Sequence, residues 1–169
     1  MAAKQRTQAQ LRDEIVAHLE DFPIQLLALE SAMEEFGEGF NLAEFKLAFE
    51  RKPSIKAYNN VQAVERAFTR VQNYIVQLAE SGSMLAGLEL PKTHESDAAR
   101  AFDALREAGV ITAAVSRDLK RAQKARSAIE HEYVAVKAGR VHEAVELVAA
   151  AARAFIGPYT AWISRALRI

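Results

Sequence analysis

The chain has 169 residues and carries 22 lysines and arginines against 22 aspartates and glutamates, so its formal net charge is zero. Half of it is apolar, which is ordinary for a soluble globular protein, and the length suits one domain over residues 1–169 with its own core. The absence of cysteine excludes disulfides, thiolate zinc sites and cysteine nucleophiles.

Apolar residues recur at alternating steps of four and three in four segments, which is the spacing of one stripe on a helix. These segments run from Leu11 to Phe36, from Val61 to Leu78, from Val115 to Tyr133 and from Val141 to Trp162. No segment alternates with period two over the length of a strand. The pattern predicts an all-α, antiparallel bundle of four long helices plus short ones.

The first long helix contains a proline, Pro23, which predicts a kink or a break, although the stripe keeps its phase across it. Gly37 and Gly39 are expected to end this helix. Asn41 then suits the N-cap of a short helix from about Leu42 to Arg51.

The later boundaries follow from similar signals. The longest irregular stretch is expected from Gly82 to His94, followed by a short helix from Ser96 to Ala108. Thr112 is a plausible N-cap for the next helix, which Gly139 is expected to end. Gly157-Pro158 predicts a kink or break in the last helix.

The N-terminal residues lack the apolar segment of a signal peptide. The alanine-rich stretch from Val145 to Ile156 is interrupted by Glu146 and Arg153 and is too short to span a bilayer. A cytoplasmic protein without membrane insertion is therefore expected.

The zero net charge is unevenly distributed along the chain. Residues 1–50 carry a net charge of −6, residues 51–100 carry +2 and residues 101–169 carry +4. Such asymmetry is a reason to look for a polyanionic or charged partner.

Most patterns that indicate chemistry are missing. No two of the four histidines have the i, i+4 spacing of a zinc-binding pair, and no glycine-rich loop suits a phosphate. A Gly-x-Ser-x-Gly motif is also lacking. We therefore expect neither a metal nor a cofactor.

Arg126 occupies a position of the third stripe that periodicity assigns to the buried or subunit-facing side. Burying a guanidinium there is unfavourable in free energy unless an anionic or hydrogen-bonding group pairs with it. His131 and Tyr133 follow at spacings of five and seven. On an ideal helix Tyr133 faces the same way as Arg126, whereas His131 lies roughly 140° around the axis. Arg126 and His131 can serve one substrate if the helix is irregular there or if a second subunit completes the site.

The segment from Arg126 to Tyr133 resembles the Arg-x4-His-x-Tyr motif of HepT-type HEPN proteins, the toxins of bacterial toxin–antitoxin pairs whose antitoxin is a minimal nucleotidyltransferase. The resemblance extends upstream through Ala101 to Ile111 and, more loosely, through Val61 to Phe68. It implies a HEPN-like helical bundle and a homodimeric, metal-independent endoribonuclease toxin of a type VII-like pair.

The resemblance also implies the role of each motif residue. Arg126 would hold and neutralise the scissile phosphate, and His131 would be the general acid or base that activates the RNA 2′-hydroxyl. Tyr133 would be the position at which the antitoxin attaches AMP and so silences the toxin.

One position departs from the family pattern. The family has Asn or Asp directly after the arginine, where this chain has Ser127. Position 127 is one helical turn before His131, so a serine there can orient the imidazole, but with shorter reach.

The basic run from Arg117 to Arg126 carries a net charge of +4 and could follow an RNA backbone. Its candidate RNA contacts are Lys120, Arg121 and Lys124. A solvated helix face is the alternative interpretation of this run. For Arg126, the structural alternative is an ion pair with Glu130 or with a glutamate of another helix.

Two other functions remain open at this stage. A non-catalytic HEPN module that docks onto a nucleotidyltransferase is favoured by Ser127. The other is a helical scaffold in which the motif is coincidental, and there Arg126 would contribute to stability alone.

Overall fold

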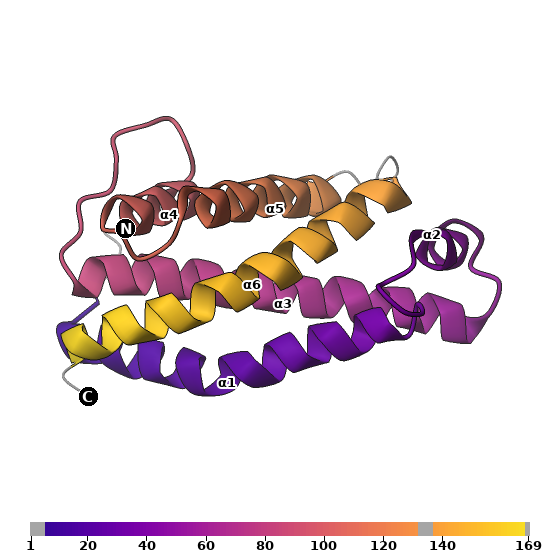
Figure 1. Cartoon of the computed structure of the whole chain (residues 1–169), viewed down its shortest axis with the longest axis horizontal. Helices are drawn as coiled ribbons and strands as arrows, with labels where there is room; N and C mark the ends of the chain where they lie inside the picture. The colour runs from indigo at the N-terminus through magenta and orange to yellow at the C-terminus, as the bar shows by residue number, and fades with distance from the viewer. Residues whose placement is uncertain (1–5, 132–136, 168–169) are drawn as a thin grey trace.

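The computed structural model describes residues 6–131 and 137–167, with the backbone alone at positions 130 and 131. Within these ranges the chain forms helices and no strand (Figure 1). The helices are α1 (Gln8–Glu34), α2 (Leu42–Arg51), α3 (Ile55–Leu85), α4 (Asp97–Glu107), α5 (Ala113–His131) and α6 (Ala138–Leu167). The expectation of an all-α fold is confirmed.

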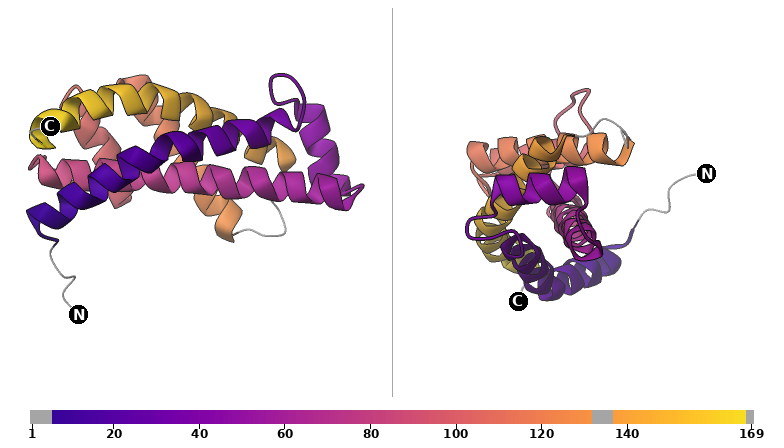
Figure 2. Two further views of the ribbon diagram at one scale, coloured as in Figure 1. Left: turned by 90° about the horizontal axis from the view of Figure 1, so that it is seen from below. Right: turned by 90° about the vertical axis from the view of Figure 1, so that its right-hand side faces the viewer.

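The long helices form an elongated antiparallel bundle. α1 and α3 lie side by side over most of their length (Figures 1 and 2). On a different side of α3, α4 packs against the first part of α5, where Lys120 pairs with Asp103. α6 runs back across the bundle, in contact with α5, α3 and α1, and α2 packs against α3 and α6 at one end. Each long helix therefore needs its neighbours to cover its apolar stripe.

The predicted stripes form one buried cluster that includes side chains from every helix. In α3, the central helix, Val64, Phe68 and Ile75 are almost completely buried. The largest fully buried side chains are Tyr159, Phe22, Phe45, Phe68, Phe102, Phe155, Ile15, Leu29, Ile75, Leu78, Leu105 and Leu119.

Polar side chains begin the helices as the sequence predicts. The side chain of Asn41 accepts a hydrogen bond from the backbone N–H of Glu44 at 3.0 Å, and α2 then runs from Leu42 to Arg51. The hydroxyl of Thr112 likewise accepts from Val115 N–H at 3.2 Å at the start of α5. Both caps satisfy a donor that the first turn leaves unpaired.

Several predicted helix boundaries differ from the structure. Of the kink or break expected at Pro23 and at Pro158, the break does not occur, because both prolines lie inside continuous helices, α1 and α6. Gly139 lies in the first turn of α6 instead of ending α5, and α3 continues past Gly82 to Leu85. Tertiary packing explains these differences, because burial of the apolar residues around each breaker outweighs its local cost.

No helix in the described part of the chain is both long enough and apolar enough to cross a membrane.

Gly82 allows α3 and α6 to approach each other closely. The Tyr159 hydroxyl donates a hydrogen bond to the carbonyl oxygen of Leu78 at 2.5 Å, and burial raises the pKa of this phenol. A Cβ atom at position 82 would come within 3.0 Å of Tyr159 Cζ and still closer to the hydroxyl oxygen. The glycine is thus required by contact with α6 rather than by a turn.

Gly82→Ala should lower the free energy of unfolding by about 1–3 kcal/mol, because the added methyl group overpacks the contact with Tyr159. Gly139→Ala is the matched control, since nothing lies within 4 Å of a Cβ at that helical position. It should be neutral or slightly stabilising. Urea unfolding of both variants measures the difference, and equal stability would contradict the tight contact.

Candidate functional site

Arg126 projects from the face of α5 that packs on the bundle. Leu119 and Ala122, at earlier positions of the same stripe, are fully buried, and Arg126 itself is half-buried. Its guanidinium donates a hydrogen bond to the side-chain oxygen of Asn73 in α3. The expectation that Arg126 lies on the inward stripe is confirmed.

The other motif residues are less fully described. Ser127 is exposed on α5, and α5 remains α-helical through His131. The side chains of Glu130 and His131 and all of Tyr133 lie outside the described residues. The roles assigned to these three residues remain predictions.

The contact between α3 and α5 beside Arg126 is polar. Gln72 is completely buried and its side-chain N–H donates to the side-chain oxygen of Gln123 at 3.0 Å. Together with the pair of Asn73 and Arg126, this bond fixes how α5 is seated on α3.

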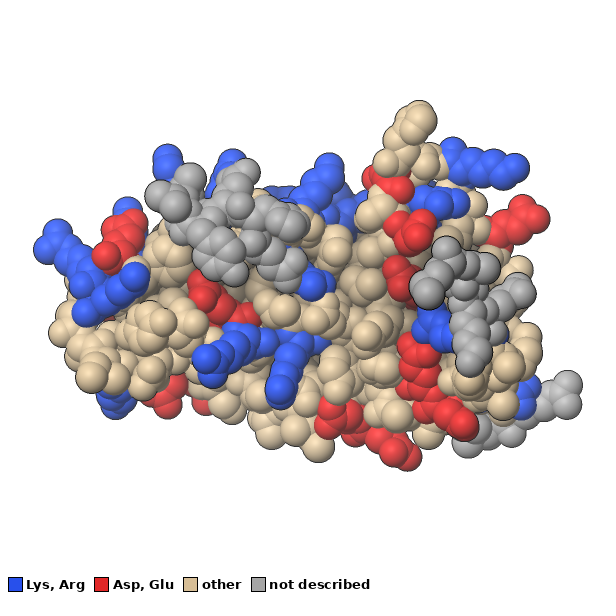
Figure 3. Space-filling view, turned by 180° about the vertical axis from the view of Figure 1, so that it is seen from behind, with Lys and Arg blue, Asp and Glu red and all other residues tan. Residues whose placement is uncertain are grey.

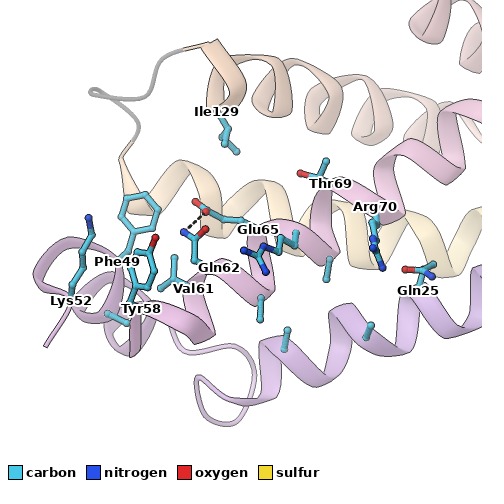
Figure 4. A pocket seen from close by; sticks show the side chains of 16 residues that line it. Gln25, Phe49, Lys52, Tyr58, Val61, Gln62, Glu65, Thr69, Arg70 and Ile129 are labelled. Atoms are coloured by element: carbon cyan, nitrogen blue, oxygen red, sulfur yellow. Dashed lines mark hydrogen bonds between the residues drawn. The ribbon is translucent and has the colours of Figure 1, made fainter. Parts of the chain in front are cut away.

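An open groove of about 1150 Å³ runs along the outer face of α3 (Figure 4). Its walls come mainly from α1, α2 and α3, and Ile129 contributes from α5. The lining residues are Gln25, Ala28, Ala32, Ala48, Phe49, Lys52, Tyr58, Val61, Gln62, Ala63, Glu65, Arg66, Ala67, Thr69, Arg70 and Ile129. Alanines from α1 and α3 leave the space between these helices unfilled.

The charged side chains of the groove are mostly basic. Lys52, Arg66 and Arg70 line it, together with Glu65 as its carboxylate. Burial raises the pKa of Glu65, although the hydrogen bond from Gln62 at 3.1 Å and the charge of Lys52 act in the opposite direction. The three basic side chains outnumber the one carboxylate that lines the groove with them.

A second polar cluster adjoins the groove where α1 meets α3. The Tyr74 hydroxyl donates a hydrogen bond to the Asp21 carboxylate, and Gln25 donates to the same oxygen at 2.9 Å. These bonds, with smaller contributions from the charges of Arg70 and His18, lower the pKa of Asp21. The hydrogen bond to Asp21 also raises the pKa of Tyr74, and burial raises it further by a smaller amount.

Two of the three predicted RNA contacts take part in ion pairs. Lys120 donates to Glu95 at 3.1 Å and to Asp103 at 2.5 Å, and Arg121 pairs with Glu143 at 2.6 Å. Burial alone would lower the pKa of Lys120, but its bonds to the two carboxylates outweigh that effect and raise it. Lys120 therefore ties α5 to α4 and to the loop before it.

Lys124, the third predicted contact, is exposed and lines a smaller pocket of about 270 Å³ between α5 and α6. On the face opposite α6, Figure 3 shows lysine and arginine side chains near the centre and a group of acidic side chains toward the right-hand end.

Arg66, Arg70 and Asn73 are not among the site residues predicted from the sequence. They lie on α3 at spacings of four and three, so they share one face of that helix. This polar row runs beside the buried stripe and could have been found from its spacing. Nothing in the sequence, however, showed that α5 would bring Arg126 to the end of the row.

Among the described residues, no group of three or more histidine, aspartate or glutamate side chains is arranged to hold a metal ion. Comparison of the chain with protein-family models, with curated proteins and with solved structures found no match. The case for a function therefore depends on the site and on the motif.

The bond between Tyr74 and Asp21 predicts a pH-dependent contribution to stability. A carboxylate whose pKa is lowered on folding stabilises the protein above its unfolded pKa of about 4, and this contribution is lost as the pH falls through the lower folded value. Tyr74→Phe should therefore be destabilising near pH 7, with a difference that shrinks below about pH 4. Urea unfolding of the wild type and the variant across this range tests it, and a pH-independent difference would refute the linkage.

Proposed function

We propose that this protein is a metal-independent endoribonuclease toxin of the HepT-type HEPN class, silenced by a nucleotidyltransferase antitoxin. The observation that carries the proposal is Arg126, half-buried on an otherwise apolar stripe and five residues before His131. Its guanidinium binds Asn73, three positions after Arg70 of the basic groove, and Ile129, one position short of a full turn after Arg126, also lines that groove. The sequence resemblance supplies the reaction class.

In the proposed reaction, the Arg126 guanidinium binds the scissile phosphate and stabilises the charge that develops on its oxygens. His131 removes the proton from the RNA 2′-hydroxyl, whose oxygen then attacks the phosphorus. The bond from phosphorus to the 5′-oxygen breaks, and the protonated His131 returns the proton to that leaving oxygen. The products are a 2′,3′-cyclic phosphate and a 5′-hydroxyl.

The geometry of α5 supports a homodimeric site. An ideal helix places positions 126 and 131 roughly 140° apart around its axis. Because α5 is α-helical through His131, an irregular turn between the two positions does not bring them together. We therefore propose that His131 of one subunit acts with Arg126 of the other.

Silencing is proposed to occur at Tyr133. Attachment of AMP to its hydroxyl would add a negative charge close to a site that has to bind a phosphate, and repulsion would exclude the RNA. The antitoxin would thus inhibit the toxin by covalent modification of Tyr133 and not only by binding over the site.

A non-catalytic module that docks onto a nucleotidyltransferase is the second candidate. The exposed Ser127, where the family has Asn or Asp, favours it. This candidate predicts partner binding that survives loss of His131 and no cleavage of RNA.

Purified protein should cleave single-stranded RNA in excess chelator and leave 2′,3′-cyclic ends. His131→Ala should reduce the rate by about 10²–10⁴-fold, because it removes the acid–base group. His94→Ala is the matched control, since His94 is exposed in the loop before α4 and should retain the wild-type rate. Equal cleavage by His131→Ala and the wild type would rule out the proposed reaction.

Co-expression with a neighbouring nucleotidyltransferase gene should increase the intact mass of this chain by whole AMP units. Tyr133→Phe lacks the acceptor hydroxyl and should show no increase, whereas Tyr58→Phe should be modified like the wild type. AMP addition that persists in Tyr133→Phe would place the acceptor elsewhere.

A further inference from the structure

The groove on α3 leads along one helix face to Arg126. Arg66 and Arg70 are one turn apart, and Asn73, which accepts the hydrogen bond from Arg126, follows at the next position of the same row. Arg66, Arg70 and the pair of Asn73 and Arg126 therefore follow one another along one face of α3. Such a row matches the repeated charges of a nucleic-acid backbone.

The arginines of the groove are accessible to a ligand. Arg66 and Arg70 are both exposed, and in the part of the chain that the structure describes neither forms an ion pair within 4.0 Å. Arg70 lies within electrostatic reach of Asp21, but that carboxylate already accepts hydrogen bonds from Tyr74 and Gln25. Both guanidinium groups are thus available for phosphate oxygens, which they suit as bidentate donors.

The far end of the groove carries aromatic rings. Phe49 from α2 and Tyr58 from α3 lie beside each other there, next to Lys52 (Figure 4). Tyr58 is 45% exposed, and its ring borders the open space. An exposed ring beside cations is a platform for an unpaired nucleobase.

We propose that the α3 groove binds single-stranded RNA, with Arg66 and Arg70 on successive phosphates and Tyr58 stacked on an unpaired base. Tyr58 and Arg70 are twelve residues apart, which is about 18 Å along α3 and enough for a few extended nucleotides. The groove thereby leads the strand toward Arg126. The link to cleavage rests on the proposed function, whereas binding in the groove is tested on its own.

Single strands are favoured over duplexes by the aromatic end of the groove. Stacking on Tyr58 requires a base that is not already stacked and paired in a helix, whereas the arginines alone would accept either form. The occupant predicted here is therefore a flexible strand. An acidic protein segment could pair with the guanidinium groups, but it has no nucleobase to stack on the ring of Tyr58.

The test measures the affinity of the full-length protein for a fluorescein-labelled, mixed-sequence single-stranded RNA of twelve nucleotides, by anisotropy at several salt concentrations. The double variant Arg66→Gln, Arg70→Gln should bind at least roughly tenfold more weakly. The slope of log affinity against log salt should fall by roughly 0.7 for each arginine removed. Arg165→Gln, an exposed arginine on α6, is the matched control and should bind as the wild type does.

The stacking role is tested with two variants of one residue. Tyr58→Ala should weaken binding by at least about fivefold, while Tyr58→Phe keeps the ring and should retain the wild-type affinity. A double-stranded RNA of the same length should bind more weakly and should be insensitive to Tyr58→Ala. Circular dichroism melting of every variant confirms that each one folds.

The experiments distinguish failure of the groove proposal from failure of the proposed ribonuclease function. RNA binding that is weakened in the groove variants supports the groove even if the wild type cleaves nothing, in which case the proposed ribonuclease function is wrong. RNA binding by the wild type that is unchanged in the groove variants overturns the groove, whatever the cleavage result. An absence of RNA binding by the wild type, or equal binding of duplex and single strand, also overturns it.

Discussion

The burial of the apolar stripe of α3 is the constraint on which the rest of the molecule depends. Val64, Phe68 and Ile75 are almost completely buried in the core that α3 forms with its neighbouring helices, which fixes the rotation of α3 about its own axis. Once that rotation is fixed, Arg66 and Arg70 must point outward, because they occupy the opposite side of the same turns. The hydrophobic core thus determines which charges the groove presents.

The position of Arg126 follows from a similar constraint on α5. Burial of Leu119 and Ala122 turns the next position of the stripe toward α3, where the side chain of Asn73 accepts a hydrogen bond from the guanidinium. The ion pairs of Lys120 hold the other end of α5 to α4 and to the loop before it. A basic run that suggested an RNA contact therefore also orients the helix that carries the motif.

Small side chains serve two different purposes in this bundle. Ala28 and Ala63 leave a hollow between α1 and α3, and that hollow becomes the floor of a groove. Gly82 instead brings α3 into contact with α6, and the buried Tyr159 hydroxyl donates to the α3 backbone beside it. Small side chains thus leave a groove on the side of α3 that meets α1 and allow close packing on the side that meets α6.

The helices and the inward position of Arg126 could be predicted from the sequence, because apolar periodicity and N-cap chemistry act within a few residues. The continuity of α1 and α6 through Pro23 and Pro158 could not, since it depends on burial against other helices. The pairing of Arg126 with Asn73 joins residues 53 positions apart. Local patterns show which face of a helix is polar, but the packing of α5 on α3 determines which polar faces meet.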